Sequence, residues 1–184
     1  MLEEIKMLFQ NGKLLVRKLE LKDNYLLAKW LSDPLVLEYY EGRDNPFDLE
    51  KVNKKFYQCK NGVIGCIVEF ENIEIGYTQY YQLDNETRNL YGYVDVPDII
   101  YGIDQFIGEI EYWNRGIGTL LVKSMVEFLV EQKQADRVVM DPQTSNKRAI
   151  RCYEKCGFER VKLLPKNELH EGEYRDCWLI EYIK

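Results

Sequence analysis

Hydrophobic side chains along the chain follow two spacings, which predict strands in some segments and helices in others. Short runs rich in Val, Ile, Tyr and Phe, bounded by turn formers, are typical of strands. They predict strands at residues 14–16, 63–70, 73–82, 99–107, 137–140, 158–164 and 176–183. Glu71 and Asn72 separate two of these runs, as in an antiparallel hairpin.

Apolar residues spaced three and four apart alternate with these runs and indicate amphipathic helices. They predict helices at residues 21–31, 35–38, 49–57, 117–132 and 147–155. Asp48 is a plausible N-cap for the third helix, and Ser145 or Asn146 for the last, which Gly157 ends. Residues 83–96 are polar and aromatic without a clear period, so we predict neither a helix nor a strand there.

The composition fits one folded domain spanning residues 1–184. A chain of 184 residues with 46% hydrophobic content can bury one substantial core but is short for two. A net charge of −6 disfavours nucleic acid as a partner, because that affinity comes from clustered Lys and Arg. A cationic partner fits this charge better, although a modest acidic balance also serves solubility.

The chain ends and the cysteines indicate a soluble, cytoplasmic protein without membrane contact. Residues 1–6 include the charged Glu3, Glu4 and Lys6 where a signal peptide needs an apolar run, and no eighteen apolar residues follow one another. The cysteines are odd in number and form no Cys-x-x-Cys pair, so we expect reduced thiols. They are Cys59, Cys66, Cys152, Cys156 and Cys177. Two of them lie four apart on a predicted helix; a metal or disulfide role is conceivable, but packing explains them and we assign no chemistry.

His170 is the only histidine, which excludes His-based catalytic triads and multi-histidine metal sites. We expect it to be a solvated loop residue, and we expect no metal in the protein.

A glycine loop precedes the clearest predicted helix, 117–132. The loop reads Asn114-Arg115-Gly116-Ile117-Gly118-Thr119. A strand, a Gly-x-Gly loop and a helix start place unpaired N–H groups and the positive helix end where a phosphate can bind. The loop is neither a Walker A loop nor a complete dinucleotide fingerprint. By itself it indicates only an anion site, and glycines before a helix also serve packing.

A second motif follows the loop. Asn146, Ala149, Tyr153 and Gly157-Phe158 form the pattern Asn-x-x-Ala-x-x-x-Tyr-x-x-x-Gly-Phe. Together with the loop, this pattern resembles the GNAT superfamily of N-acetyltransferases. The resemblance implies an α/β (α+β) fold with a central mixed, mostly antiparallel twisted sheet flanked by helices, and a splayed V-shaped opening between central strands. It also implies acetyl-CoA as the cosubstrate.

Further segments narrow the resemblance to the aminoglycoside 6′-N-acetyltransferases within that superfamily. They are residues 102–108, 112–114, 141–142 and 169–172. The resemblance implies acetyl transfer to the 6′-amine of an aminoglycoside, a cationic small molecule, which confers antibiotic resistance. Monomer and dimer both stay open. Trp113 departs from the superfamily loop, which usually has Gln or Arg there, but backbone N–H groups supply the expected phosphate contacts.

The resemblance also implies roles for individual residues. Asp104 is the candidate general base that deprotonates the attacking ammonium, although an aspartate pKa of ~3.9 requires burial to raise it, or else Asp104 orients the amine. Tyr153, a phenol with a pKa of ~10, is the candidate general acid for the leaving thiolate. The implied cofactor-binding residues are Gln105, Phe106, Ile107, Asn114, Arg115, Gly116, Ile117, Gly118, Thr119, Asn146, Ala149 and Lys155. The implied substrate-binding residues are Tyr40, Gln79, Asp104, Asp141 and Glu171.

Two other functions share parts of this pattern. Siderophore- or lysine-type N-acyltransferases share the segment around Asp104 and the Tyr-Trp pair, and only the substrate separates them. A non-catalytic sensor that binds acetyl-CoA and a protein partner is the second alternative, and the presence of Asp104 and Tyr153 argues against it.

Overall fold

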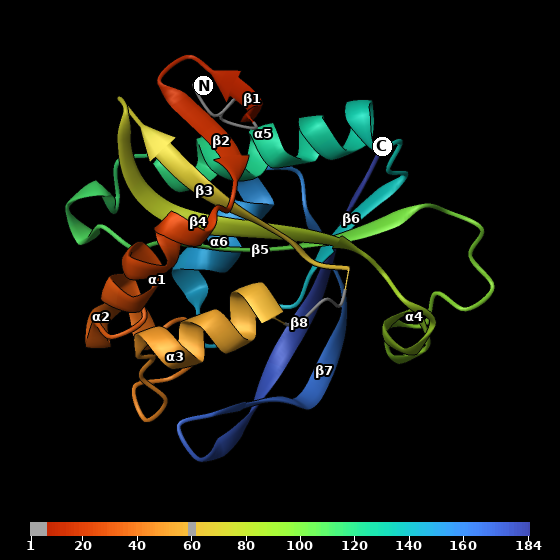
Figure 1. Cartoon of the computed structure of the whole chain (residues 1–184). Coiled ribbons are helices and arrows are strands. Elements are labelled where there is room, and N and C mark those ends of the chain that lie inside the picture. The colour runs from red at the N-terminus through yellow and green to blue at the C-terminus, as the bar shows by residue number, and fades with distance from the viewer. Residues whose placement is uncertain (1–6, 59–61) are drawn as a thin grey trace. The chain divides into compact units, whose positions relative to one another are not determined.

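The computed structural model describes residues 7–58 and 62–184; Cys59 and the charged N-terminal stretch lie outside these ranges. Within them the strands form an eight-stranded sheet in the order β1-β2-β3-β4-β5-β6-β8-β7 (Figure 1). The strands are β1 (Met7–Asn11), β2 (Leu14–Lys18), β3 (Ile64–Phe70), β4 (Ile73–Gln82), β5 (Ile100–Ile107), β6 (Arg137–Met140), β7 (Glu159–His170) and β8 (Glu173–Ile183). β5 and β6 are parallel, whereas β1–β2, β2–β3, β6–β8 and β7–β8 are antiparallel. The predicted mixed, mostly antiparallel sheet is confirmed.

Helices lie between the strands, and all but one of them fall in segments where the sequence predicted a helix. They are α1 (Asn24–Trp30), α2 (Pro34–Leu37), α3 (Leu49–Val52), α4 (Asn85–Tyr91), α5 (Ile117–Gln132) and α6 (Lys147–Lys155). The expected cap Asp48 accepts a hydrogen bond from the Lys51 N–H at 2.8 Å, and α3 continues as a π turn at Asn53–Gln58. No helix in the described part of the chain is long and apolar enough to cross a membrane.

The chain folds as two compact units. Unit 1 comprises residues 1–79 and 105–118, and unit 2 comprises residues 80–104 and 119–184. Strands β4 and β5 therefore each contribute residues to both units. The single domain expected over residues 1–184 stays a prediction.

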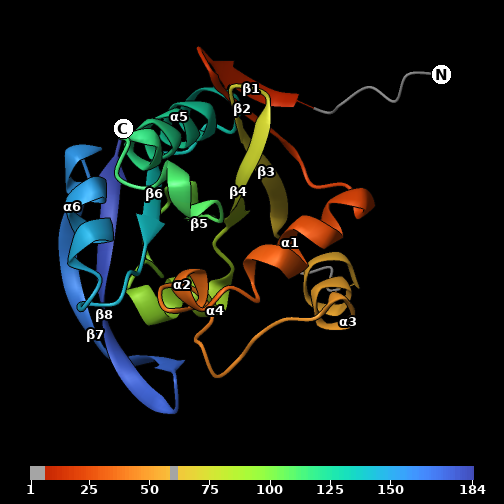
Figure 2. The same cartoon turned by 90° about the vertical axis from the view of Figure 1, so that its left-hand side faces the viewer.

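The core of unit 1 is aromatic and lies between its helices and strands. Its buried residues are Leu27, Trp30, Leu31, Val36, Leu37, Phe47, Val52, Ile67, Tyr77 and Phe106. Helices α1 and α3 lie side by side, and Asn24 donates to Asn53 at 2.9 Å (Figures 1 and 2). Gly108 meets the Trp30 ring so closely that a Cβ would lie 2.2 Å from it. The core therefore requires glycine directly after β5.

The core of unit 2 lies around β6 and β8. Its buried residues are Leu83, Tyr91, Tyr93, Ile100, Val139, Leu164, Cys177 and Leu179. β7 and β8 form a long hairpin (Figure 1) that extends past the predicted strands 158–164 and 176–183. Polar residues fill this extension, so hydrophobic alternation did not reveal it. Pro165 is tolerated in β7 because β7 is the last strand of the sheet.

Two elements were not predicted. β1 pairs with β2 through a turn at Gly12, where φ is +59°. Helix α4 lies in the segment 83–96 that showed no clear period: Asp84 caps it by accepting from the Thr87 N–H at 2.8 Å, and Gly92 ends it with φ +86°. Both helix-end signals were present in the sequence. The short helix between them exposes most of its residues, so it shows no apolar spacing from which a helix could be predicted.

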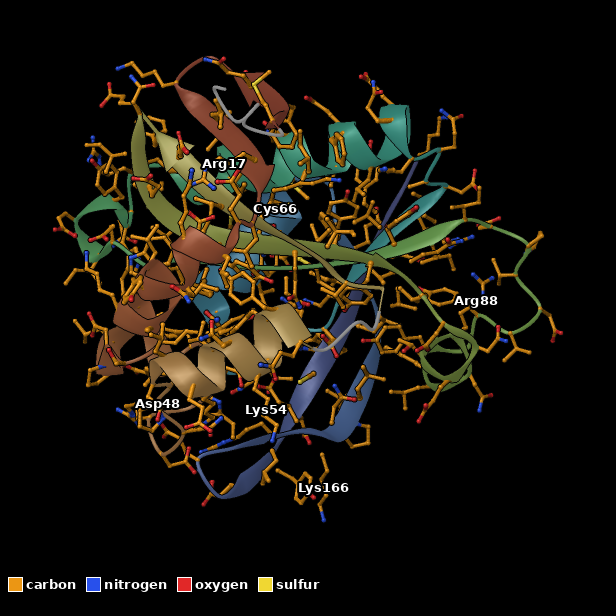
Figure 3. The ribbon with its side chains drawn as sticks, viewed as in Figure 1. Arg17, Asp48, Lys54, Cys66, Arg88 and Lys166 are labelled. Atoms are coloured by element: carbon orange, nitrogen blue, oxygen red, sulfur yellow. The ribbon has the colours of Figure 1, made fainter. Side chains whose placement is uncertain are left out.

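A buried arginine forms hydrogen-bonded ion pairs near the start of unit 1. Arg17 on β2, labelled in Figure 3 near Cys66 of the neighbouring strand β3, is only 3% exposed. Its guanidinium donates twice to Asp23, at 2.8 and 2.9 Å, and once to Glu69 at 2.7 Å. Asp23 is itself buried. Removing the cation would thus leave a carboxylate without compensation in the core.

Arg17→Met is expected to lower the free energy of unfolding by about 3–5 kcal/mol, because Asp23 then lies buried and uncompensated. Urea denaturation at pH 7 measures this loss. The matched control is Lys13→Met, which removes an ion pair with Glu71 from a lysine that is 67% exposed, and should cost about 0–1 kcal/mol. Equal losses in the two variants would contradict this account of Arg17.

Candidate active site

The glycine loop leads into α5, a helix of 16 residues, and its first three residues, 114–116, are exposed. Asn114 and Gly116 both adopt left-handed backbone conformations, with φ of +59° and +78°. A Cβ on Gly116 would meet nothing within 4 Å, so its requirement for glycine comes from the backbone alone. Ile117, the first helical residue, is buried. The anion site that the sequence indicates at this helix start stays a prediction.

The loop is attached to the end of β5. Trp113 donates its indole N–H to the Ile107 carbonyl at 2.8 Å, and its ring lies edge-on to Tyr39 at 6.2 Å. Arg115 places its guanidinium over the Tyr112 ring at 4.9 Å. Trp113, which departs from the superfamily pattern, therefore holds the loop to the end of the strand. Its side chain leaves the backbone N–H groups of the loop unaltered.

Strand β5 continues beyond its parallel partner. Pairing with β6 runs from Ile100↔Arg137 to Gly102↔Val139, and β5 goes on to Ile107. On its other side, the Phe106 carbonyl approaches Gly76 so closely that a Cβ there would lie 2.4 Å from the oxygen. β5 is a central strand of the sheet, and the splayed opening expected between central strands stays a prediction.

In unit 1, the predicted residues at the end of β5 are held by aromatic packing. The Phe106 ring lies 4.7 Å from that of Tyr40 and 5.7 Å from that of Tyr77. Tyr77 donates its hydroxyl to the Gln79 side chain at 2.8 Å. Unit 1 thus brings Tyr40 to Phe106 and ties Gln79 to the same aromatic group, while Gln105 is half-buried on the strand.

In unit 2, two carboxylates are held by tyrosines. Tyr91 and Asn167 both donate to Asp141, each at 2.9 Å. Asp104 hydrogen-bonds with Tyr81, and the charges of Asp104 and Asp141 both act on Tyr81 and on Tyr91. Unit 2 therefore brings the two predicted carboxylates into one polar network.

The network changes the titration of its members. Burial, followed by the charges of the two aspartates, raises the pKa of Tyr81, and burial with the charge of Asp141 raises that of Tyr91. Burial also raises the pKa of Asp141, and the hydrogen bonds from Tyr91 and Asn167 partly offset this by stabilising the anion. Both of these donors are neutral groups, so their hydrogen bonds stabilise the Asp141 anion without cancelling its charge.

The sequence did not single out Tyr81, Tyr91 or Asn167. Tyr81 was one of many tyrosines in a predicted strand, Tyr91 lies in the helix that was not predicted, and Asn167 lies in the unpredicted extension of β7. The signals that could have revealed one of them in advance are the cap residue Asp84 and the terminating Gly92 of α4, which carries Tyr91.

Helix α6 holds the second motif. Asn146 is its N-cap, accepting from the Ala149 N–H at 3.2 Å, which decides between the two predicted caps. Tyr153 follows seven residues, or about two turns, later and therefore lies on the same face; its ring lies 6.3 Å from that of Phe158. Lys155 is exposed. The Thr119 hydroxyl lies 3.4 Å from the Cys152 sulfur, so α6 contacts the start of α5.

The turn of the β7–β8 hairpin carries the last predicted residue. Glu171 adopts φ of +51° there and is half-buried. The expectation that His170 is solvated was wrong: it is 5% exposed, with Nδ1 lying 3.8 Å from a Glu168 oxygen. β7 extends to His170 and turns its ring inward. Within residues 7–58 and 62–184, no group of three or more His, Cys, Asp or Glu side chains is arranged to hold a metal ion.

The mixed sheet, the glycine loop at the start of α5 and the capped helix α6 together define an acetyltransferase class of fold. The family model described as "Acetyltransferase (GNAT) domain" matches residues 20–165. The chain belongs to the GNAT family of acetyltransferases.

Several relatives of the chain carry names that refer to aminoglycosides. The chain is 30% identical over 153 residues to "Aminoglycoside N(6')-acetyltransferase type 1" of Klebsiella pneumoniae, covering 82% of this chain and 76% of that protein. A stretch of 61 residues is 46% identical to "Kanamycin resistance protein" of Rhizobium radiobacter, covering 33% of this chain and 56% of that one. The solved structure of the aminoglycoside acetyltransferase AAC(6')-Ib with coenzyme A has a TM-score of 0.75 and 26% identity, over 93% of this chain and 95% of that one.

Tyr91→Phe is expected to raise the pKa of Asp141 further, since it removes a donor that favours the ionised form. The free energy of unfolding at pH 7 should fall by about 1.5–3 kcal/mol, the usual worth of a hydrogen bond to a charged group. As the pH falls toward 4, Asp141 gains a proton, and the hydrogen bond that the variant lacks becomes one between neutral groups. The loss of stability in the variant should therefore become smaller. Urea denaturation across this pH range measures both. The control Tyr174→Phe removes a hydroxyl from a residue that is 65% exposed, and a loss as large there would contradict the role of Tyr91.

Proposed function

We propose that the chain transfers the acetyl group of acetyl-CoA to the 6′-amine of an aminoglycoside and thereby confers resistance. The observation that carries this proposal is the polar network in which Asp104 hydrogen-bonds with Tyr81 and Asp141 accepts from Tyr91 and Asn167. Two carboxylates in one network suit a substrate with several ammonium groups. The relatives support the same acceptor, since AAC(6')-Ib is solved with coenzyme A and ribostamycin or kanamycin.

For the cosubstrate, we propose that the N–H groups of Arg115, Gly116, Ile117, Gly118 and Thr119 bind the pyrophosphate. The exposed, left-handed loop at the start of α5 supports this role. The backbone of Gln105, Phe106 and Ile107, where β5 continues past β6, would pair with the pantetheine arm. Asn146 would contribute its amide N–H group, because its oxygen already caps α6.

The reaction needs no covalent enzyme intermediate. Asp104 takes a proton from the substrate ammonium, and the free amine attacks the thioester carbonyl carbon. A backbone N–H of Phe106 or Ile107 stabilises the oxyanion that forms. The C–S bond then breaks as Tyr153 donates its hydroxyl proton to the thiolate, and the proton that the newly acylated nitrogen loses restores the Tyr153 hydroxyl. The products are the N-acetylated sugar and coenzyme A.

The remaining predicted residues belong to the acceptor side of this proposal. Tyr40 and Gln79 would offer an aromatic face and an amide, and both are anchored through the aromatic group of unit 1. Asp141 and Glu171 would bind further ammonium groups of the antibiotic. The net charge of −6 favours the approach of such a polycation.

Kanamycin- or tobramycin-like compounds are expected to release coenzyme A thiol from acetyl-CoA when mixed with the protein. A thiol-reactive dye follows the release, and mass spectrometry places one acetyl group on the 6′-nitrogen. A compound with a hydroxyl in place of the 6′-amine is the control and should not gain an N-acetyl group. Turnover of lysine or hydroxylamine derivatives with none of the aminoglycosides would instead favour the other N-acyltransferases, and coenzyme binding without any turnover would favour a sensor.

Asp104→Asn is expected to lower kcat by about 100- to 10,000-fold, the usual contribution of a general base. The dissociation constant of acetyl-CoA should stay unchanged, because Asp104 is assigned to the amine and not to the cofactor. Steady-state kinetics and calorimetry measure the two quantities. The matched control is Asp95→Asn, which alters an exposed aspartate. Normal turnover in Asp104→Asn would remove this residue from the base role.

A further inference from the structure

Two thiols of helix α6 lie against the first turn of α5. The Cys152 sulfur is 3.4 Å from the Thr119 hydroxyl, and the Cys156 sulfur is 3.6 Å from the Thr119 carbonyl oxygen. The two thiols are hydrogen-bonded to each other. Cys152 is half-buried, whereas Cys156 is 7% exposed. Both cysteines are free and so far have no role in the protein.

Their surroundings make the two thiols unequal. The single proton of the Cys156 thiol can be donated to the Thr119 carbonyl oxygen or to the Cys152 sulfur, and both arrangements keep the proton on Cys156. Cys152 is hydrogen-bonded by Cys156 and by the Thr119 hydroxyl, and Lys155 adds a positive charge. The hydrogen bond from the Cys156 thiol contributes most to lowering the pKa of Cys152. The same hydrogen bond raises the pKa of Cys156.

The other described cysteines differ from this pair. Cys66 and Cys177 are completely buried, and burial raises the pKa of each thiol to about 12. A thiolate is the reactive form of cysteine, so an oxidant should select Cys152 over these two.

We propose that Cys152 and Cys156 are a thiol switch, in which a peroxide oxidises Cys152, Cys156 closes a disulfide with it, and the first turn of α5 loses its support. In the first step the Cys152 thiolate attacks one peroxide oxygen, the O–O bond breaks, and sulfenic acid and hydroxide form. In the second step the Cys156 sulfur attacks the sulfenic sulfur, the S–S bond forms, and the hydroxyl leaves with the Cys156 proton as water. Sulfur is oxidised by two electrons and the peroxide is reduced.

The end of α6 permits this closure. Residues four apart in a helix have Cβ atoms about 5–6 Å apart, whereas a disulfide requires about 3.5–4.5 Å. α6 ends at Lys155, and Cys156 already has the non-helical C-cap position before Gly157, which adopts φ of +92°. The movement that closes the disulfide therefore occurs at the C-cap of α6. It withdraws the sulfur atoms from both groups of Thr119.

The effect on the coenzyme rests on the proposed function, in which Thr119 belongs to the pyrophosphate loop. A displaced Thr119 would misdirect the N–H groups at the start of α5. Oxidation should then raise the dissociation constant of coenzyme A about tenfold, within the usual range for coupled sites, and dithiothreitol should reverse the change.

Peptide mapping of the whole protein tests the switch. The protein is treated with hydrogen peroxide, remaining thiols are alkylated, and trypsin is added. Trypsin cuts after Arg151, Lys155 and Arg160, so the two cysteines fall on separate peptides, 152–155 and 156–160, which only a disulfide joins. The expected result is this linked pair, formed before any oxidation of Cys66 or Cys177, together with faster hydrogen exchange in residues 117–121.

Two variants separate the steps. Cys156→Ser should stop at a sulfenic acid that dimedone traps, with no linked peptide. Cys152→Ser, with Cys152→Ala as a second version, should keep its coenzyme affinity after peroxide. Absence of the linked peptide, oxidation spread evenly over all cysteines, or unchanged exchange at 117–121 in the disulfide form would overturn the switch. If the reduced protein itself binds no coenzyme A, the proposed function fails, while the linked peptide and the exchange rates still decide the switch.

Discussion

The continuation of β5 beyond its pairing with β6 is the constraint on which the candidate chemistry depends. The last parallel pair is Gly102↔Val139, and the strand then carries Asp104 and Phe106 before it ends at Ile107. In a fully paired sheet the backbone of these residues would bond to a neighbouring strand and offer nothing to a ligand. Directly beyond, Trp113 attaches the glycine loop to Ile107. β5 thus carries the candidate base, and the glycine loop is attached to the end of the same strand.

Charge is buried in two different ways in this chain. Arg17 in unit 1 has carboxylate partners on its guanidinium, so its charge is compensated and its effect is confined to the fold. Asp141 in unit 2 has tyrosine and amide donors, which stabilise an anion without cancelling its charge. The first arrangement stabilises the fold. The second lowers the stability and leaves a negative charge that a cationic ligand can compensate. This contrast, more than the overall charge, supports a polycationic acceptor.

Thr119 joins the two motifs that the sequence presented separately. It ends the glycine loop, and its hydroxyl and carbonyl contact the two thiols of α6. Because α6 also carries Asn146 and Tyr153, any movement of its C-terminal end reaches the start of α5 through a short chain of contacts.

The sequence by itself determined the features that depend on local order along the chain. Helix α5, the Asn146 cap, the glycine loop and the central strands could be predicted, because spacing, capping chemistry and left-handed turns are properties of a few neighbouring residues. Tertiary structure alone decided the partners of the carboxylates and the burial of His170. Tyr81, Tyr91 and Asn167 come from β4, α4 and β7, far apart in sequence, and nothing in their own neighbourhoods distinguishes them from other polar residues. A side chain that acts through a distant partner is identified only once the chain has folded, since its contacts arise from packing and not from sequence spacing.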